Sequence, residues 1–133
     1  MDYANQILIA GGMSIVAFGF LLGIPMIMAR EKAPRAPRYL IAAHLAAIIQ
    51  GGLLLALTVA FGFSPLPSGA ETLAAFLLVG GMTFFDLGLA LNWIQGVEDA
   101  FEKRSLGYRV SSVGTPLILI GTGIVLYGVI VAL

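Results

Sequence analysis

The stretch AAHLAAIIQGGLLLAL, residues 42–57, sets one histidine and one glutamine among apolar residues and glycines. It lies in one of four long apolar segments, at about residues 6–28, 40–63, 72–96 and 112–133. As a helix, each segment is long enough to cross a hydrocarbon core of ~30 Å. The segments lack the alternation of apolar and polar residues that membrane strands show. The sequence therefore predicts an all-α, integral membrane four-helix bundle in one domain, residues 1–133.

The amino-acid composition is typical of a protein embedded in membrane lipid. Hydrophobic residues make up 59% and charged residues 11% of the 133 residues, and the mean hydropathy is +1.01. The chain has no cysteine, which excludes disulfides, thiolate ligands and a cysteine nucleophile. The balanced charge gives no sign of a nucleic-acid partner. The first residues lack a basic stretch before the apolar segment, so we expect the first helix to be retained.

The basic residues predict how the chain is oriented. They fall into two groups, which are Arg30, Lys32, Arg35 and Arg38, and then Lys103, Arg104 and Arg109. Cytoplasmic loops are enriched in Lys and Arg. We therefore expect both basic connections in the cytoplasm and both termini on the other side, which in the inner membrane of a bacterium is the periplasm.

Two features suggest helix ends, and glycine spacing suggests helix contacts. Pro116 is expected in the first turn of the last helix, and the third helix is expected to project into the cytoplasm until Gly107 ends it. Glycines recur at four- or seven-residue spacing along single helix faces: Gly19 and Gly23, Gly81 and Gly88, and Gly114, Gly121 and Gly128. Such faces allow close packing in lipid. They fit packing within one chain or a homo-oligomer equally well.

Ionisable groups in hydrocarbon are costly and usually face a partner, a cavity or a ligand. His44 and Asp86 are the two such groups in the apolar segments. Helical rise places His44 and Asn92 each about 6–7 Å from the cytoplasmic ends of their helices, and Gln50 and Asp86 each about 15 Å from them. These depths predict one pocket that opens toward the cytoplasmic half.

The chemistry of these residues leaves several roles open. His44 and Gly51 lie on one helical stripe, where a planar cofactor could rest against bare backbone while His44 ligates its metal. A hydrogen bond between helices and a proton-handling role are the alternatives for His44. Asp86 has no Lys or Arg at its depth, and it could act as a general acid, a proton relay or an inter-helix hydrogen bond. Asn92 can both donate and accept in a pocket.

Two stretches resemble known families of small four-helix membrane proteins. PRYLIAAHLAAIIQGGLLLAL, residues 37–57, resembles the second helix of hydroxylaminobenzene mutases, and LNW, residues 91–93, resembles their third-helix Asn-Trp pair. The spacing of His44, Gln50 and Gly51 is also similar to that of styrene oxide isomerase, which carries a b-type haem. The resemblance implies a homotrimer in which His44 is the axial ligand of haem b near a subunit interface.

The same resemblance implies catalytic roles for Gln50, in the place of an active-site Asn, and for Asn92 in the same pocket. Asp86 completes the expected catalytic group. Two residues depart from the pattern, because Gln50 is one methylene longer than Asn and Ala46 stands where the mutases have an acidic residue. These residues would serve an isomerase or mutase in which ferric haem acts as a Lewis acid on a small hydrophobic aromatic epoxide or arylhydroxylamine.

Three other functions compete with this one. A glutathione-using membrane enzyme has similar length and topology, and Arg38 and Arg109 are placed to meet an anionic tripeptide. A small transporter or proton-relay subunit would use His44 and Asp86. Three copies of His44 could also converge on a zinc ion at a trimer axis, with water as the fourth ligand.

Overall fold

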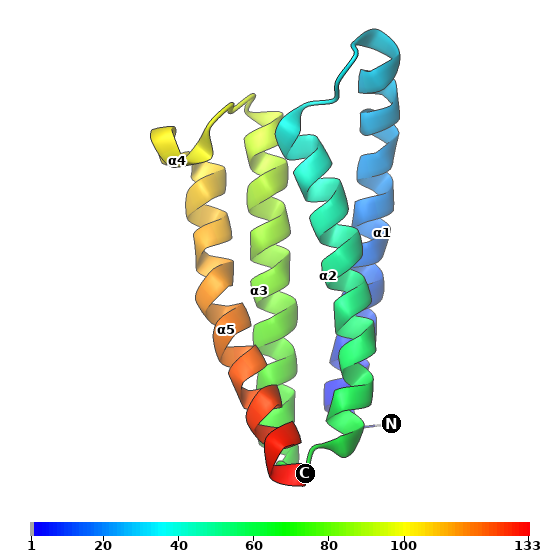
Figure 1. Ribbon diagram of the computed structural model, residues 1–133, viewed down its shortest axis with the longest axis vertical. Helices are drawn as coiled ribbons and strands as arrows, with labels where there is room; N and C mark the ends of the chain where they lie inside the picture. Colours follow the sequence, from blue (N-terminus) through cyan, green and yellow to red (C-terminus); the bar gives the residue numbers. More distant parts are fainter. Residues whose placement is uncertain (1) are drawn as a thin grey trace.

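The computed structural model describes residues 2–133 and contains four long helices. They are α1 (Tyr3–Lys32), α2 (Arg38–Phe63), α3 (Ser68–Ile94) and α5 (Leu106–Ala132), and a short helix, α4 (Ala100–Lys103), precedes α5 (Figure 1). All four long helices are long and apolar enough to cross a membrane. No strand occurs among the described residues. The predicted all-α four-helix fold is confirmed.

The four long helices begin earlier than the apolar segments do, and polar side chains cap two of them, α1 and α5. The Asp2 carboxylate accepts the backbone N–H of Asn5 at 2.7 Å and starts α1. The Ser105 hydroxyl accepts the N–H of Tyr108 at 3.1 Å and starts α5 six residues before the predicted position. The prediction for Pro116 was therefore wrong, since Pro116 lies inside α5. A helix tolerates an internal proline in a membrane when neighbouring groups satisfy the freed backbone carbonyl.

The predicted projection of α3 into the cytoplasm was also wrong. Gly96 has φ +63°, and the N–H groups of Gly96 and Val97 bond to the carbonyls of Trp93 and Asn92 at 3.0 and 2.9 Å. These two bonds form a Schellman motif, in which glycine adopts the left-handed conformation that ends a helix. The chain turns there instead of continuing, and Asp99 then caps α4 by accepting the N–H groups of Phe101 and Glu102.

The bundle is organised around α3, which packs against α1, α2 and α5. The most extensive contacts join α3 to α5 and α1 to α2, each a pair of consecutive long helices. The larger apolar core is built around Leu8, Ile15, Ala47, Leu54, Ala74, Leu78 and Met82. A smaller core toward the charged end contains Leu22, Leu40, Ala43 and Ala90.

The glycine rows lie where two helices approach most closely. A Cβ on Gly81 would lie 2.9 Å from the carbonyl oxygen of Gly114, and a Cβ on Gly88 would overlap the carbonyl oxygen of Gly107. Such distances are too short for any side chain, so bare backbone is required at these contacts. Of the two interpretations of the glycine rows, packing within one chain is the one observed.

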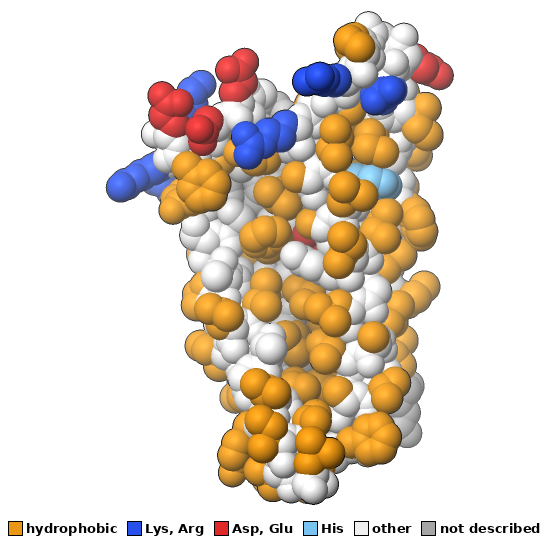
Figure 2. All heavy atoms as spheres, viewed as in Figure 1, with side chains coloured by type: hydrophobic (Ala, Val, Ile, Leu, Met, Phe, Trp, Pro, Cys, Tyr) orange, Lys and Arg blue, Asp and Glu red, His pale blue; other side chains and the backbone are white. Residues whose placement is uncertain are grey.

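Most charged side chains on the face in view gather at one end of the molecule, around α4 and the α1–α2 connection, and apolar side chains predominate over the rest of that face (Figure 2). All the Lys and Arg residues lie between residues 30 and 38 or between 103 and 109. Both termini lie at the opposite end of the bundle (Figure 1). The two basic connections therefore share one end, and a long apolar surface separates them from the termini.

Candidate functional site

His44 lies at the contact between α1 and α2. Its Nδ1 is 2.7 Å from the carbonyl oxygen of Gly19, and a Cβ on Gly23 would lie 3.4 Å from the ring carbon Cε1. Because a carbonyl only accepts, Nδ1 must carry the proton, and in the neutral ring Nε2 is then the free acceptor. Nε2 has no hydrogen-bond partner among the described residues and is not fully buried. The inter-helix bond predicted as one alternative is present, and it leaves one ring nitrogen available.

The exposed edge of His44 borders a cavity of about 230 Å³ on the outer face of α1 and α2. The cavity is lined by Met26, Arg30, Ala36, Ile41, His44 and Leu45. Leu45 is half exposed, so this cavity opens sideways from the bundle. An imidazole acceptor, apolar walls and one basic residue, Arg30, thus meet on an outward-facing surface of α1 and α2.

Gly51 does not line this cavity. A Cβ at this position would lie 2.7 Å from the carbonyl oxygen of Gly12 and 2.8 Å from the backbone nitrogen of Val16. The stripe of His44 and Gly51 therefore faces α1 along its length. The prediction that a planar cofactor rests on Gly51 was wrong, because the backbone of α1 already occupies that space.

Asn92 is 1% exposed and faces α5. Its Oδ1 accepts the Ser105 hydroxyl at 2.6 Å, and a Cβ on Gly107 would overlap that oxygen. The same Ser105 hydroxyl caps α5. Asn92 therefore ties the start of α5 to the end of α3, while His44 faces α1. The prediction of one pocket shared by His44 and Asn92 was wrong for a single chain.

Asp86 is 2% exposed, and neither carboxyl oxygen has a hydrogen-bond partner within the described chain. It lines a groove of about 210 Å³ between α1 and α3, together with Ser14, Ile15, Phe18, Thr83 and Leu87. Gln50 also has a buried oxygen, Oε1, without a partner in the described part of the chain. These two predicted residues thus hold acceptors that the described chain leaves unsatisfied, and no hydrogen bond joins them.

Sequence reasoning missed two polar residues with defined partners. The Tyr39 hydroxyl accepts the N–H of Ala100 at 2.9 Å in a buried position and fixes the α3–α5 connection against α2. Ser105 bonds to Asn92 as described above. A Ser before a helical stretch is a usual N-cap signal, which could have located Ser105. Nothing near Tyr39 in the sequence indicates its distant partner.

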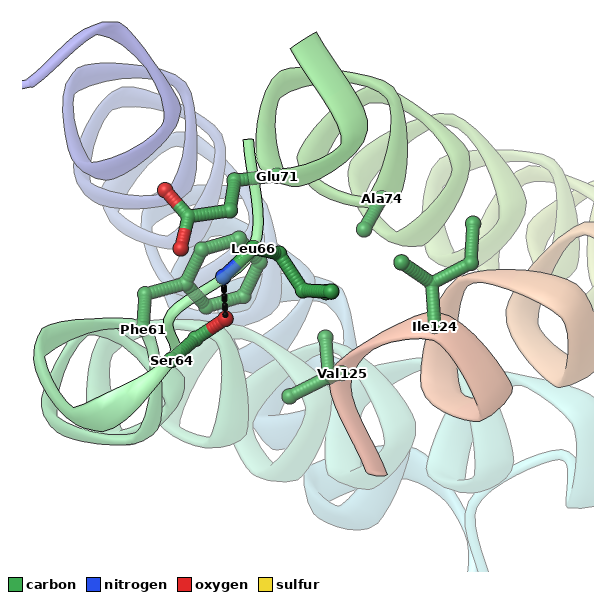
Figure 3. Close-up of a pocket in the computed structure, with 7 residues that line it drawn as sticks. All are labelled: Phe61, Ser64, Leu66, Glu71, Ala74, Ile124 and Val125. Carbon is green, nitrogen blue, oxygen red and sulfur yellow. Dashed lines mark hydrogen bonds between the residues drawn. The ribbon is translucent and has the colours of Figure 1, made fainter. Parts of the chain in front are cut away.

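Three further spaces are less suited to chemistry. A crevice of about 300 Å³ has almost entirely apolar walls, formed by Leu53, Leu57, Leu78, Met82, Ile118, Thr122, Val125, Leu126 and Val129. A cavity of about 260 Å³ at the charged end includes Arg38, Trp93 and Glu98. Figure 3 shows the third, where Phe61, Leu66, Ile124 and Val125 converge beside Ser64. It leaves no room for a water molecule.

The described residues contain no group of three or more His, Cys, Asp or Glu side chains that could hold a metal ion. A zinc site at His44 would therefore need several copies of the chain, as the trimer hypothesis assumed. No protein-family model matches the chain, and neither a curated protein nor a solved structure matches it.

Proposed function

We propose that this protein is a membrane-embedded, haem-dependent isomerase or mutase that uses His44 as the axial ligand of haem b. The orientation of His44 is the observation that supports this proposal. The Nδ1–H group donates to the Gly19 carbonyl at 2.7 Å, which fixes the tautomer and the ring plane. Metal-ligating histidines commonly donate their second nitrogen to a carbonyl in this way.

The surroundings of His44 fit a haem in their chemistry but not in their volume. Met26, Ile41 and Leu45 offer apolar contact to a macrocycle, and Arg30 offers a cation for a propionate. The cavity of about 230 Å³ is smaller than the ~300–1,000 Å³ of pockets that enclose a drug-sized ligand. We therefore propose that another copy of the chain covers the cofactor in a homo-oligomer, of which a trimer is the form that the resemblance implies.

The chain itself would orient the cofactor and exclude water. His44 would hold the haem, which when bound would supply Lewis-acid chemistry toward an epoxide or hydroxylamine oxygen. Apolar walls around His44 keep out water that would otherwise capture a cationic intermediate. A small aromatic substrate partitions into the bilayer and can reach a laterally open site directly.

The other predicted catalytic residues lie apart from His44 in one chain. Asn92 is engaged by Ser105, and Asp86 lies in the groove between α1 and α3. Gln50 keeps a buried Oε1 without a hydrogen-bond partner among the described residues, so it remains the residue of this group that we propose as a substrate-orienting amide.

The charge distribution supports a proposed location in the inner membrane of a bacterium. With the basic connections in the cytoplasm, the His44 cavity would lie in the cytoplasmic half of the bilayer, because Arg30 borders it. Both termini would then lie in the periplasm.

The visible spectrum of the purified protein tests the proposal, with haem available during expression. His44→Asn is the informative variant, because an Asn amide nitrogen takes the approximate position of Nδ1 and can still donate to Gly19, while the Nε2 acceptor is lost. We expect a Soret band in the wild type and none in His44→Asn or His44→Ala, with His44→Asn close to the wild type in stability.

Two outcomes would refute the proposal. A Soret band unchanged in His44→Asn would exclude His44 as the ligand. A colourless wild type, after haem has been added to the purified protein, would exclude haem and favour the zinc, glutathione or proton-relay alternatives. If the band behaves as expected, aromatic epoxides and arylhydroxylamines are the first substrates to test for rearrangement.

A further inference from the structure

The groove between α1 and α3 holds a carboxyl group without a partner. Asp86 is 2% exposed, yet both of its oxygens lack hydrogen bonds within the described chain. It borders a space of about 210 Å³. Buried polar groups are nearly always hydrogen-bonded, and an unpaired carboxyl in hydrocarbon is especially costly. A group in this position is a candidate for binding something from outside the chain.

The neighbouring hydroxyls cannot satisfy Asp86 by donating to it. The Ser14 hydroxyl donates to the Ala10 carbonyl at 2.7 Å, and the Thr83 hydroxyl donates to the Val79 carbonyl at 2.8 Å. The hydroxyl oxygens of Ser14 and Thr83 can still accept hydrogen bonds. The polar part of the groove is therefore a set of acceptors, one of them a carboxyl, and an occupant must supply hydrogen-bond donors.

No basic side chain of the described residues is paired with Asp86. Every Lys and Arg lies at residues 30–38 or 103–109, at the charged end of the bundle. Arg109 of α5 comes nearest to Asp86 in depth, because Gly88 packs against Gly107 and Ser111, but the Arg109 side chain is exposed and makes no hydrogen bond to Asp86. A charge complementary to an ionised Asp86 would therefore come from outside the described chain.

The remaining walls of the groove are apolar and open to the side. Ile15, Phe18 and Leu87 line it, and Ser14 and Leu87 are exposed. A molecule dissolved in the bilayer could therefore enter the groove between α1 and α3 laterally, without passing through the aqueous phase. Three potential ligand groups are too few for a bare divalent cation, since Ca²⁺ takes about 6–8 oxygens and Mg²⁺ about six.

We propose that this groove binds a small lipid-soluble amine, with its nitrogen on Asp86 and its hydrocarbon part against Ile15, Phe18 and Leu87. An ammonium group offers several N–H donors and a positive charge together, which suit a carboxylate flanked by hydroxyl acceptors. The aromatic ring of Phe18 is a favourable neighbour for a cation. A neutral alcohol offers only one donor and no charge.

The amine site is separate from the His44 site. Along α1, His44 meets Gly19 and Gly23, whereas the groove uses Ser14, Ile15 and Phe18. The two cavities share no lining residue, and of the groove residues only Ile15 lies one turn of α1 from Gly19. Amine binding is thus independent of haem binding, and either proposal can fail without the other.

Fluorine NMR of 4-fluorobenzylamine with the protein in lipid nanodiscs tests the amine site, and 4-fluorobenzyl alcohol is the matched neutral probe. We expect saturable broadening of the amine signal. In Asp86→Asn the affinity should fall about tenfold, or about 1.4 kcal/mol. The alcohol should bind weakly and equally to both proteins.

A second pair of variants tests the location without altering the carboxyl group. Ser14→Phe places a ring at the mouth of the groove and should abolish amine binding. Met13→Phe adds the same ring at the adjacent exposed position, outside the groove, and should leave binding unchanged. The proposal is refuted if the wild type shows no saturable amine binding. It is also refuted if Ser14→Phe binds the amine as the wild type does.

Discussion

Substitution of the two adjacent glycines of α2 by alanine should have opposite effects on stability. Gly51 faces α1, where a Cβ would lie 2.7 Å from the Gly12 carbonyl oxygen and 2.8 Å from the Val16 nitrogen. Gly52 has no atom within 4 Å of a Cβ position. Gly51→Ala and Gly52→Ala therefore add the same methyl group to the same helix, one in a closed contact and one in open space.

The expected magnitudes follow from these distances. Ordinary contact begins at 3.4 Å, so α1 and α2 must separate locally by about 0.7 Å to admit the Gly51→Ala methyl, because close-packed backbone cannot rotate away as a side chain can. Overpacking of this kind costs about 1–3 kcal/mol. Both variants gain about 0.5–1 kcal/mol by losing the conformational freedom of glycine. We expect Gly52→Ala to be neutral or slightly stabilising, and Gly51→Ala to be less stable than Gly52→Ala by about 1–3 kcal/mol.

Reversible unfolding in mixed micelles, with SDS as denaturant and far-ultraviolet circular dichroism as signal, measures this difference. Equal free energies of unfolding for the two variants would refute the close α1–α2 contact at Gly51. If Gly51→Ala instead kept full stability but lost haem, that result would support the original prediction that a planar cofactor rests against Gly51.

Three further predictions test the fold. Gly81→Ala should destabilise the α3–α5 contact by about 1–3 kcal/mol relative to Gly80→Ala, which meets open space; equal stability would contradict this contact. Tyr39→Phe leaves the Ala100 N–H without its acceptor, at a cost of about 1–3 kcal/mol. Trypsin should then cleave faster after Lys103 and Arg104, at the end of α4, and an unchanged rate would argue against the bond. Because the chain has no cysteine, single cysteines at Gly69→Cys and Glu102→Cys can report the orientation of the protein in the membrane. An impermeant maleimide added to intact cells should label Gly69→Cys and not Glu102→Cys. The opposite labelling pattern would show that the proposed topology is inverted.

Much of the candidate site could not be predicted from the sequence, and His44 illustrates the reason. Its depth in the membrane and its possible hydrogen bond were both accessible from the sequence. Its partner, the Gly19 carbonyl, is a backbone group, and residue type does not indicate which backbone group a side chain contacts. Asn92 was predicted in the same pocket by depth alone, yet it bonds to Ser105 on the other side of α3. The sequence indicates how deep in the bilayer a side chain lies, but it does not indicate which neighbouring helix the side chain faces.

The sequence by itself determined the number of membrane-crossing helices, the end at which the basic residues gather and the glycines that share a face. Composition and helical periodicity are sufficient for these, since each depends on a single helix. Only the tertiary structure decided which neighbour each face meets: Gly51 with Gly12, Gly81 with Gly114, and Asp86 with the groove beside Ser14. Helices that are apolar on every side carry no amphipathic signal to distinguish the inner face from the outer one, and in lipid the pairing depends on close backbone packing.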